Sequence, residues 1–157
     1  NSPDWPNGTL SGLTAGENDH FITTIAADWH RLPGRIARRL FARGHEPDPE
    51  TLAMAKAEIG AADPVLLRDI WMSLTSLDFR NLLQNFPVPL HLAAGGKSQL
   101  YGPGVRAWYQ QNVPEFCLTV FENSGHAPHL EEPEKFNELL LDELGRPVAA
   151  GRVEAAR

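Results

Sequence analysis

The chain has 157 residues, of which 42% are hydrophobic and 22% are charged, so it is long enough for one domain with a buried core. Its formal net charge of -6 argues against nucleic acid as the main partner, because phosphate binding needs a surplus of lysine and arginine. Cys117 is the single cysteine, so no internal disulfide can form and a reducing, cytoplasmic location is expected. No apolar run approaches the roughly 20 residues of a membrane span, and no membrane partner is expected.

The two ends of the chain are rich in turn-forming or small residues. Residues 1–16 contain two prolines and three glycines, which predicts an irregular entry segment. Asn1 is not an initiator methionine and no signal-peptide pattern follows it, so natural processing and a cut would both fit. Residues 146–157 are small and polar, and we expect a flexible tail there.

Helical spacing follows the entry segment. Phe21, Ile25 and Trp29 recur every four residues and would share one helix face. Pro33 and Gly34 are then expected to interrupt the helix, before a second helix that is rich in arginine.

Two further helices have the same start signal, an aspartate followed by a proline. Asp48 with Pro49, and Asp63 with Pro64, each place a side-chain acceptor at the N-cap and a proline in the first turn. The last of these helices carries an apolar stripe of Leu66, Ile70, Leu74 and Leu77. We therefore interpret residues 17–77 as four short helices without a strand.

The character of the chain changes at residue 78. Two short apolar runs, 88–94 and 117–121, are bounded by turn residues and predict buried strands. A helix over residues 104–112 is expected between them, and Pro133 begins a last helix that ends at residue 145. Two parallel strands cannot form a stable sheet alone, because their outer edges would be bare. We therefore expect further strands, from the same gene product or from another chain, to complete the sheet.

The sequences around these strands resemble a known family. Residues 86–95 (FPVPLHLAAG) resemble the penultimate core strand of α/β-hydrolases, and residues 121–136 (FENSGHAPHLEEPEKF) are similar to their final strand, histidine loop and closing helix. The helices before them resemble the lid of that family, and the resemblance is clearest over residues 78–144. It implies an α/β fold class: the C-terminal part of an α/β-hydrolase sheet with a four-helix lid, completed by a missing N-terminal half.

The resemblance also implies a Ser-His-acid mechanism, with His126 at the position of the histidine. An imidazole suits this role because its pKa lies near neutrality, so it can accept a proton and return it. The alternative is an exposed loop histidine without a role in catalysis. His126 is the one residue that we predict to be catalytic.

The nucleophile and the acid of the family are both missing from their usual places. No Gly-x-Ser-x-Gly segment occurs, so we expect the nucleophile upstream of residue 1 and an inert chain by itself. Ser98 stands three residues after Gly95, where the family commonly has aspartate. Some members place the acid after the sixth strand, which would lie just upstream of Asn1. Asp78 and Glu122 are in-chain alternatives, although a helix cap and a strand end would also explain them.

Two other motifs suggest ligands but lack essential parts. Residues 96–98 (GKS) copy the end of a phosphate-binding loop without its upstream glycine. His126, His129 and Glu131 have metal-binding side chains, but Pro128 keeps the two histidines off a regular helix, and structural support for a metal is not apparent. We predict no cofactor and no metal, and we expect His129 to pack in the loop or to line a pocket.

Two further features have a simple structural interpretation. Cys117 begins an apolar strand and is expected to be buried and inert. The arginines of residues 31–43 are expected to form a solvated helix face, with the edge of an acid-binding pocket or a partner contact as the alternative.

The predicted function is the hydrolysis of a small ester, lactone or related acyl bond, once the N-terminal half of the protein is present as the partner. A cofactor-independent dioxygenase of the same fold is one alternative, in which the histidine would deprotonate a small-molecule substrate. A binding module on a degenerate hydrolase scaffold is the other alternative, and Ser98 at the usual acid position is the feature that favours it.

Overall fold

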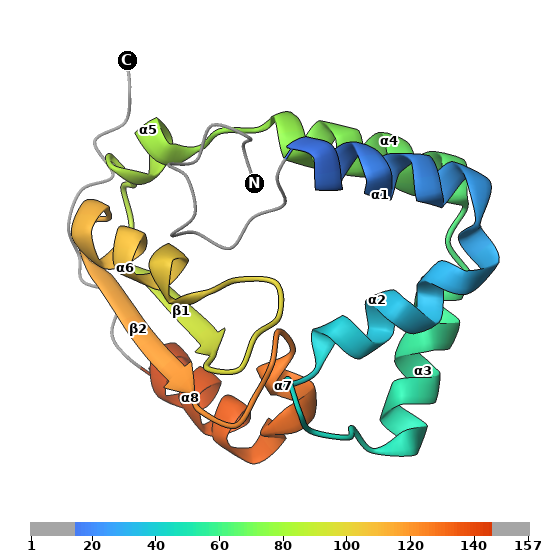
Figure 1. Cartoon of the computed structure of the whole chain (residues 1–157). Helices are drawn as coiled ribbons and strands as arrows, with labels where there is room; N and C mark the ends of the chain where they lie inside the picture. Colours follow the sequence, from blue (N-terminus) through green and yellow to red (C-terminus); the bar gives the residue numbers. More distant parts are fainter. Residues whose placement is uncertain (1–14, 146–157) are drawn as a thin grey trace.

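In the computed structural model, residues 15–145 are described. Most of the predicted entry segment and the whole predicted tail, residues 146–157, lie outside this range. Figure 1 shows the described chain as two neighbouring parts, N-terminal helices along the top and the right and a strand unit on the left.

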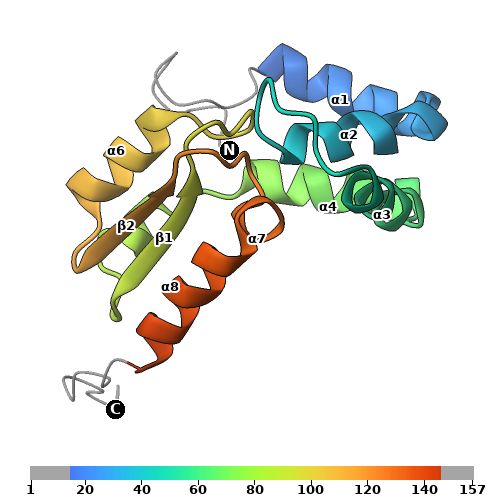
Figure 2. The same cartoon turned by 90° about the horizontal axis from the view of Figure 1, so that it is seen from below.

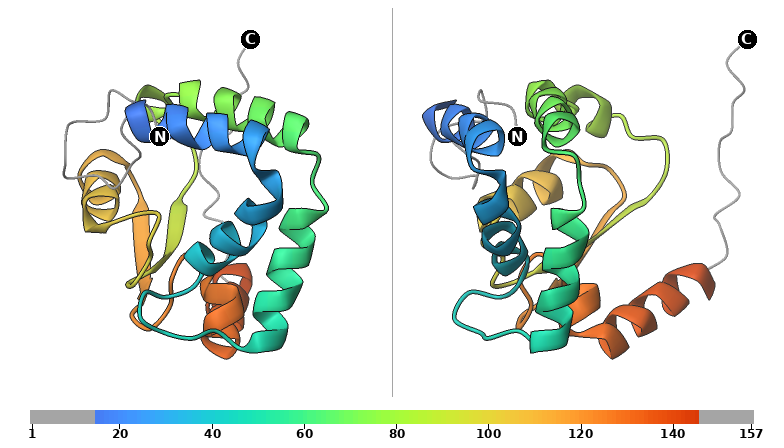
Figure 3. Two further views of the ribbon diagram at one scale, coloured as in Figure 1. Left: turned by 45° about the vertical axis from the view of Figure 1, so that its right-hand side comes forward. Right: turned by 90° about the vertical axis from the view of Figure 1, so that its right-hand side faces the viewer.

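The N-terminal part consists of helices that are called the lid helices below. Within the described range they are α1 (Ala15–Ala27), η1 (Trp29–Arg31), α2 (Leu32–Leu40), α3 (Pro49–Gly60) and α4 (Pro64–Ser76). They pack in two pairs, α1 against α4 and α2 against α3, which Figure 3 shows from two sides. The ring of Phe21 packs edge-on against Trp71 at a centroid distance of 4.7 Å and joins the first pair.

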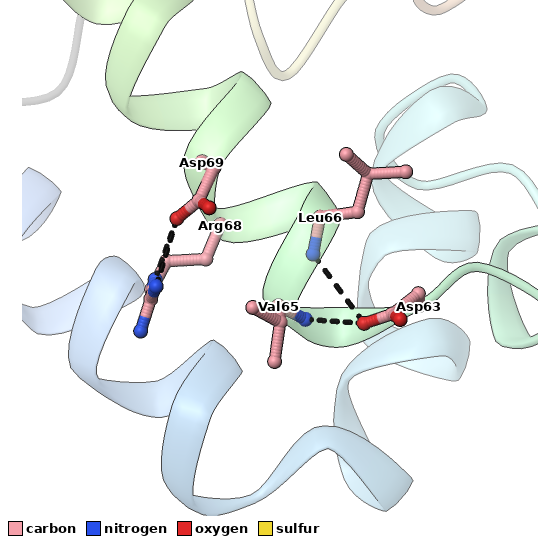
Figure 4. Close-up of polar contacts among 5 residues, drawn as sticks. All are labelled: Asp63, Val65, Leu66, Arg68 and Asp69. Carbon is pink, nitrogen blue, oxygen red and sulfur yellow. Dashed lines mark hydrogen bonds and ion pairs between the residues drawn. The ribbon is translucent and has the colours of Figure 1, made fainter.

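The two Asp-Pro start signals are confirmed. The Asp48 carboxylate accepts the N–H of Thr51 at 2.8 Å, and Asp63 accepts the N–H of Val65 at 2.8 Å and that of Leu66 at 3.4 Å (Figure 4). Each bond satisfies backbone donors that the first helical turn leaves without an intrahelical acceptor.

The predicted interruption at Pro33 and Gly34 is wrong. Both residues lie in the first turn of α2, where a proline lacks only an N–H that the helix would not use. The chain instead bends at Asp28, whose carboxylate lies 3.1 Å from Nδ1 of His30 and 3.8 Å from Nε of Arg31.

The C-terminal part is the strand unit. It comprises α5 (Arg80–Leu83), β1 (Leu90–Gly95), α6 (Pro103–Asn112), β2 (Phe116–Phe121), α7 (Pro128–Glu131) and α8 (Pro133–Gly145). The two strands pair in parallel, from Leu90 opposite Phe116 to Gly95 opposite Phe121. Figure 2 shows α6 on one side of this pair and α8 on the other. The predicted strand–helix–strand–helix order is confirmed, while the short helix α7 falls in a segment predicted to be a loop.

The strands are less buried than predicted. Their side chains are half-buried, apart from the exposed Cys117 and the buried ends at Gly95 and Phe121. The prediction of a buried Cys117 is therefore wrong. Within the described range no third strand joins the sheet, so the outer edge of each strand lacks a strand neighbour.

The buried core lies where the lid helices meet the strand unit. Ala37, Phe41 and Ala55 form its centre, and Leu130 of α7 packs against them together with the half-buried Leu40, Leu52 and Ile59. On the far side, Nδ1 of His91 in β1 lies 2.9 Å from Oε1 of Glu143 in α8. None of the helices between residues 15 and 145 is both long and apolar enough to cross a membrane.

Candidate functional site

Three segments meet at the carboxyl ends of the two strands. They are residues 40–43 at the end of α2, residues 96–102 after β1 and residues 122–127 after β2. Residues 122–127 are called the histidine loop below. The N–H of Lys97 donates to the carbonyl of Ser124 at 2.9 Å, which joins the two strand loops. Ligand sites of open parallel sheets form at this edge.

Two glycines allow the close approach of these segments. A Cβ on Gly125 would lie 2.2 Å from the carbonyl carbon of Phe41 and 2.5 Å from the nitrogen of Ala42. A Cβ on Gly95 would lie 1.5 Å from the carbonyl oxygen of Gly125. The glycine of the Ser-Gly-His motif is therefore required by packing, independently of any chemistry.

The backbone of His126 is fixed by the lid helices. Its N–H donates to the carbonyl of Leu40 at 2.7 Å, and the next N–H, of Ala127, donates to the same oxygen at 3.0 Å. This oxygen belongs to the last residue of α2, where carbonyls lack intrahelical partners. The histidine loop thus occupies the C-terminal end of a lid helix.

The ring of His126 is exposed and lies beside Tyr101, with the ring centroids 5.2 Å apart and the planes tilted by 46°. The surrounding atoms desolvate the imidazole in part, which lowers its pKa, and the charge of His129 lowers the pKa further. The neutral form is therefore favoured, and a neutral imidazole can accept a proton. Among the described residues none forms a side-chain hydrogen bond with this ring. The catalytic role of His126 stays a prediction.

Ser98, at the usual position of the acid, has another structural role. Its Oγ accepts the N–H groups of Leu100 and Tyr101, both at 3.2 Å. The hydroxyl thereby stabilises the turn that carries Tyr101 next to His126.

The two in-chain acid alternatives also lie in structural positions. Asp78 binds the side chain and the backbone N–H of Arg80 at the start of α5, and these hydrogen bonds lower the pKa of the carboxyl to about 2. Glu122 is exposed, directly after β2, and its carboxylate lies beside Gly96. Neither carboxylate forms a hydrogen bond with the His126 ring in the described part of the chain.

Two glutamates outside the predicted catalytic site hold the histidine loop. Glu131 accepts the N–H of Ala42 at Oε1, at 2.7 Å, and the N–H of Gly125 at Oε2, at 2.6 Å. Glu132 accepts the hydroxyl of the fully buried Ser124 at 2.5 Å. No local signal in the sequence indicates the bond to Ala42, because that residue lies 89 positions from Glu131.

Two of the three possible metal ligands, His129 and Glu131, make other contacts. Both carboxylate oxygens of Glu131 accept backbone N–H groups, and the ring of His129 packs 5.8 Å from that of Phe136. Across residues 15–145, no three metal-binding side chains gather into a possible site.

Comparison with known proteins gives relatives that are about twice as long. No family model matches the chain. It is 30% identical over 137 residues to a pimeloyl-[acyl-carrier protein] methyl ester esterase from Nitrosomonas europaea, a match that covers 85% of the chain and 52% of the esterase. The chain thus spans about half the length of the curated relatives it matches.

Solved structures give the same picture. An esterase from Exiguobacterium antarcticum matches with a TM-score of 0.79 at 24% identity, over 86% of the chain and 50% of the esterase. An enol-lactonase from Burkholderia xenovorans matches with a TM-score of 0.72 at 17% identity, over 80% of the chain and 48% of the lactonase. At these identities the likeness concerns the fold alone, and the fold of the chain corresponds to about half of each enzyme.

Proposed function

Because the chain belongs to the α/β-hydrolase superfamily, we propose that it supplies the lid and the catalytic histidine of an enzyme that hydrolyses a small ester, lactone or related acyl bond. The surroundings of His126 carry this proposal. The His126 ring is accessible and has a lowered pKa, and its backbone is fixed at the carboxyl ends of two parallel strands.

In the proposed mechanism His126 accepts and returns a different proton in each of two half-reactions. It takes the proton of a nucleophilic hydroxyl as that oxygen attacks the ester carbonyl, and it returns the proton to the departing alcohol. It then takes a proton from water, which attacks the acyl-enzyme, and returns that proton to the nucleophile as the acid product leaves. The lowered pKa favours the neutral imidazole with which each half-reaction begins.

The partner in this proposal is the N-terminal half of the same fold, which would bring the nucleophile, the oxyanion amides and the acid. Two observations support a covering partner. Both strands are only half-buried, and α8 leaves apolar side chains open, with Leu141 70% and Leu144 81% exposed. Surfaces of this kind mark interfaces in globular proteins.

A narrower proposal concerns the acyl donor. The curated relatives are named as esterases of an acyl group on a carrier protein. Arg35, Arg39 and Arg43 are exposed on and after α2 in a chain whose net charge is -6. These arginines could attract an acidic macromolecule to a protein that is acidic as a whole. If the carrier is acidic, a carrier-bound methyl ester is a candidate substrate beside small free esters.

The test is His126→Ala in the complete protein, with His129→Ala as the matched control. Removal of a general base typically lowers kcat by about 10²- to 10⁴-fold if no other group replaces it. We expect this loss for His126→Ala with an unchanged Tm. At a pH above the acid limb of the activity profile, His129→Ala should keep its turnover of a p-nitrophenyl ester.

Three other results would refute the proposal. Full activity of the His126→Ala variant would exclude the role of this imidazole. Oxygen uptake without ester hydrolysis in the parent protein would favour the dioxygenase alternative. Ligand binding without turnover of any ester, lactone or carrier-bound ester would favour the binding module.

A further inference from the structure

One carboxylate joins the lid helices to the histidine loop. Oε1 of Glu131 accepts the N–H of Ala42, which lies just after α2, and Oε2 accepts the N–H of Gly125, directly before His126. The two distances, 2.7 and 2.6 Å, are those of charge-assisted hydrogen bonds. Because Glu131 is partly buried, these bonds are less exposed to competition from water than surface bonds are.

The surrounding contacts leave the loop little freedom to shift by itself. The N–H of His126 donates to the carbonyl of Leu40, and Gly125 lies against the peptide group between Phe41 and Ala42, where a Cβ would overlap. Leu130, the neighbour of Glu131, packs into the core cluster that includes Phe41. The position of the His126 backbone is therefore set by residues 40–42 of the lid as much as by β2.

From this arrangement we propose that Glu131 is a positioning residue, which couples the placement of the lid helices to the placement of His126. The structural part of this proposal stands by itself, and its effect on turnover rests on the proposed function. Misplacement of a catalytic group by about 1 Å can cost about 10²-fold in rate, so a bond that fixes the loop acts on kcat through the imidazole.

The decisive variant is Glu131→Gln in the complete protein. Glutamine has nearly the same shape, but it has one acceptor oxygen, and its amide group would face a backbone N–H with another donor. The matched control is Asp48→Asn. It makes the same carboxylate-to-amide change on a carboxylate that also accepts a lid N–H, that of Thr51, without reaching the histidine loop.

Two readouts separate coupling from simple destabilisation. In Glu131→Gln we expect amide hydrogen exchange at Ala42, Gly125 and His126 to become at least about tenfold faster, with the amides of the β1–β2 pair as the unchanged reference. We expect kcat to fall between about tenfold and 100-fold, and KM to change less than threefold. Asp48→Asn should leave kcat and these three amides as they are.

Several results would overturn the proposal. Unchanged exchange at both Ala42 and Gly125 in Glu131→Gln would show that the carboxylate does not hold them. Faster exchange with an unchanged kcat would show that the loop position does not matter for turnover.

If Glu131→Gln does not fold, Glu131→Asp is measured in its place, because it keeps the charge but is one methylene too short to reach both amides. Unfolding of both variants would mean a purely structural role. A parent protein without ester hydrolysis would refute the proposed function, while hydrogen exchange would still decide whether Glu131 couples the two segments.

Discussion

The lid helices and the strand unit differ in how much of their packing the chain itself provides. The lid helices pair with one another, and Ile25 of α1 is fully buried. The strands are only half-buried, and α8 exposes Leu141 and Leu144. A helix satisfies its backbone hydrogen bonds internally, whereas a strand needs a neighbour on each side. The two regions therefore differ in backbone pairing more than in exposed apolar side chains, because α4 of the lid also exposes Leu66, Ile70 and Leu74.

The largest effect on stability is expected at the point where the two regions meet. Phe41 is 2% exposed at the centre of the core cluster, and Phe41→Ala should cost about 3–5 kcal/mol through lost contacts and a cavity. Urea denaturation of the complete protein measures this change. The control is Phe79→Ala, which removes a ring that is 52% exposed and should cost much less. Equal costs for the two variants would mean that the Phe41 cluster is not the junction of the two regions.

A smaller effect is expected inside the lid alone. Asp63→Ala removes the acceptor at the start of α4 and should lower the free energy of unfolding by about 1 kcal/mol. Asp69→Ala is the control in the same helix, because its exposed ion pair with Arg68 should contribute less than about 0.5 kcal/mol. Both changes are read from the urea midpoint. A larger loss for Asp69→Ala would contradict the view that local capping stabilises the lid.

The smallest expected effect is on the pH dependence of turnover, and it tests whether His129 lowers the pKa of His126 in the histidine loop. His126 must be neutral to act as a base, so activity falls as the pH drops through its pKa. The charge of His129 lowers that pKa, so His129→Ala should raise the pKa and move the acid limb of kcat/KM to higher pH. His20→Ala, in the exposed part of α1, should leave the limb in place. A limb that stays or moves to lower pH after His129→Ala would be inconsistent with this electrostatic coupling.

Much of the fold could be predicted because its signals are local. The caps at Asp48 and Asp63 act within three residues, and periodicity places the longer helices. The four-residue helix α7 escaped prediction because it is too short to show a period. The first strand begins at Leu90, two residues later than predicted, since its pairing starts where the N–H of Leu90 donates to Glu115.

The candidate site was predictable in part. His126 was identified from its own loop sequence, and the structure places it at the strand ends beside Tyr101. The sequence indicates Glu131 only as a possible metal ligand, and it cannot indicate the bond to Ala42 because the two residues are 89 positions apart. The exposure of Cys117 was mispredicted for a similar reason, since burial of a strand depends on its neighbours.

The sequence by itself determined the order of the longer helices and the strands and the parallel pairing that two short apolar runs and a crossover helix require. Through its resemblance to a family it also led to His126 as the predicted general base. Only the tertiary structure decided which groups surround that imidazole: the Leu40 carbonyl that receives its N–H, the carboxylate of Glu131 that bridges two segments, and the ring of Tyr101 beside it. The physical reason is one of range. Helix caps and periodicity act over a few residues, whereas hydrogen bonds between distant segments exist only after those segments have packed.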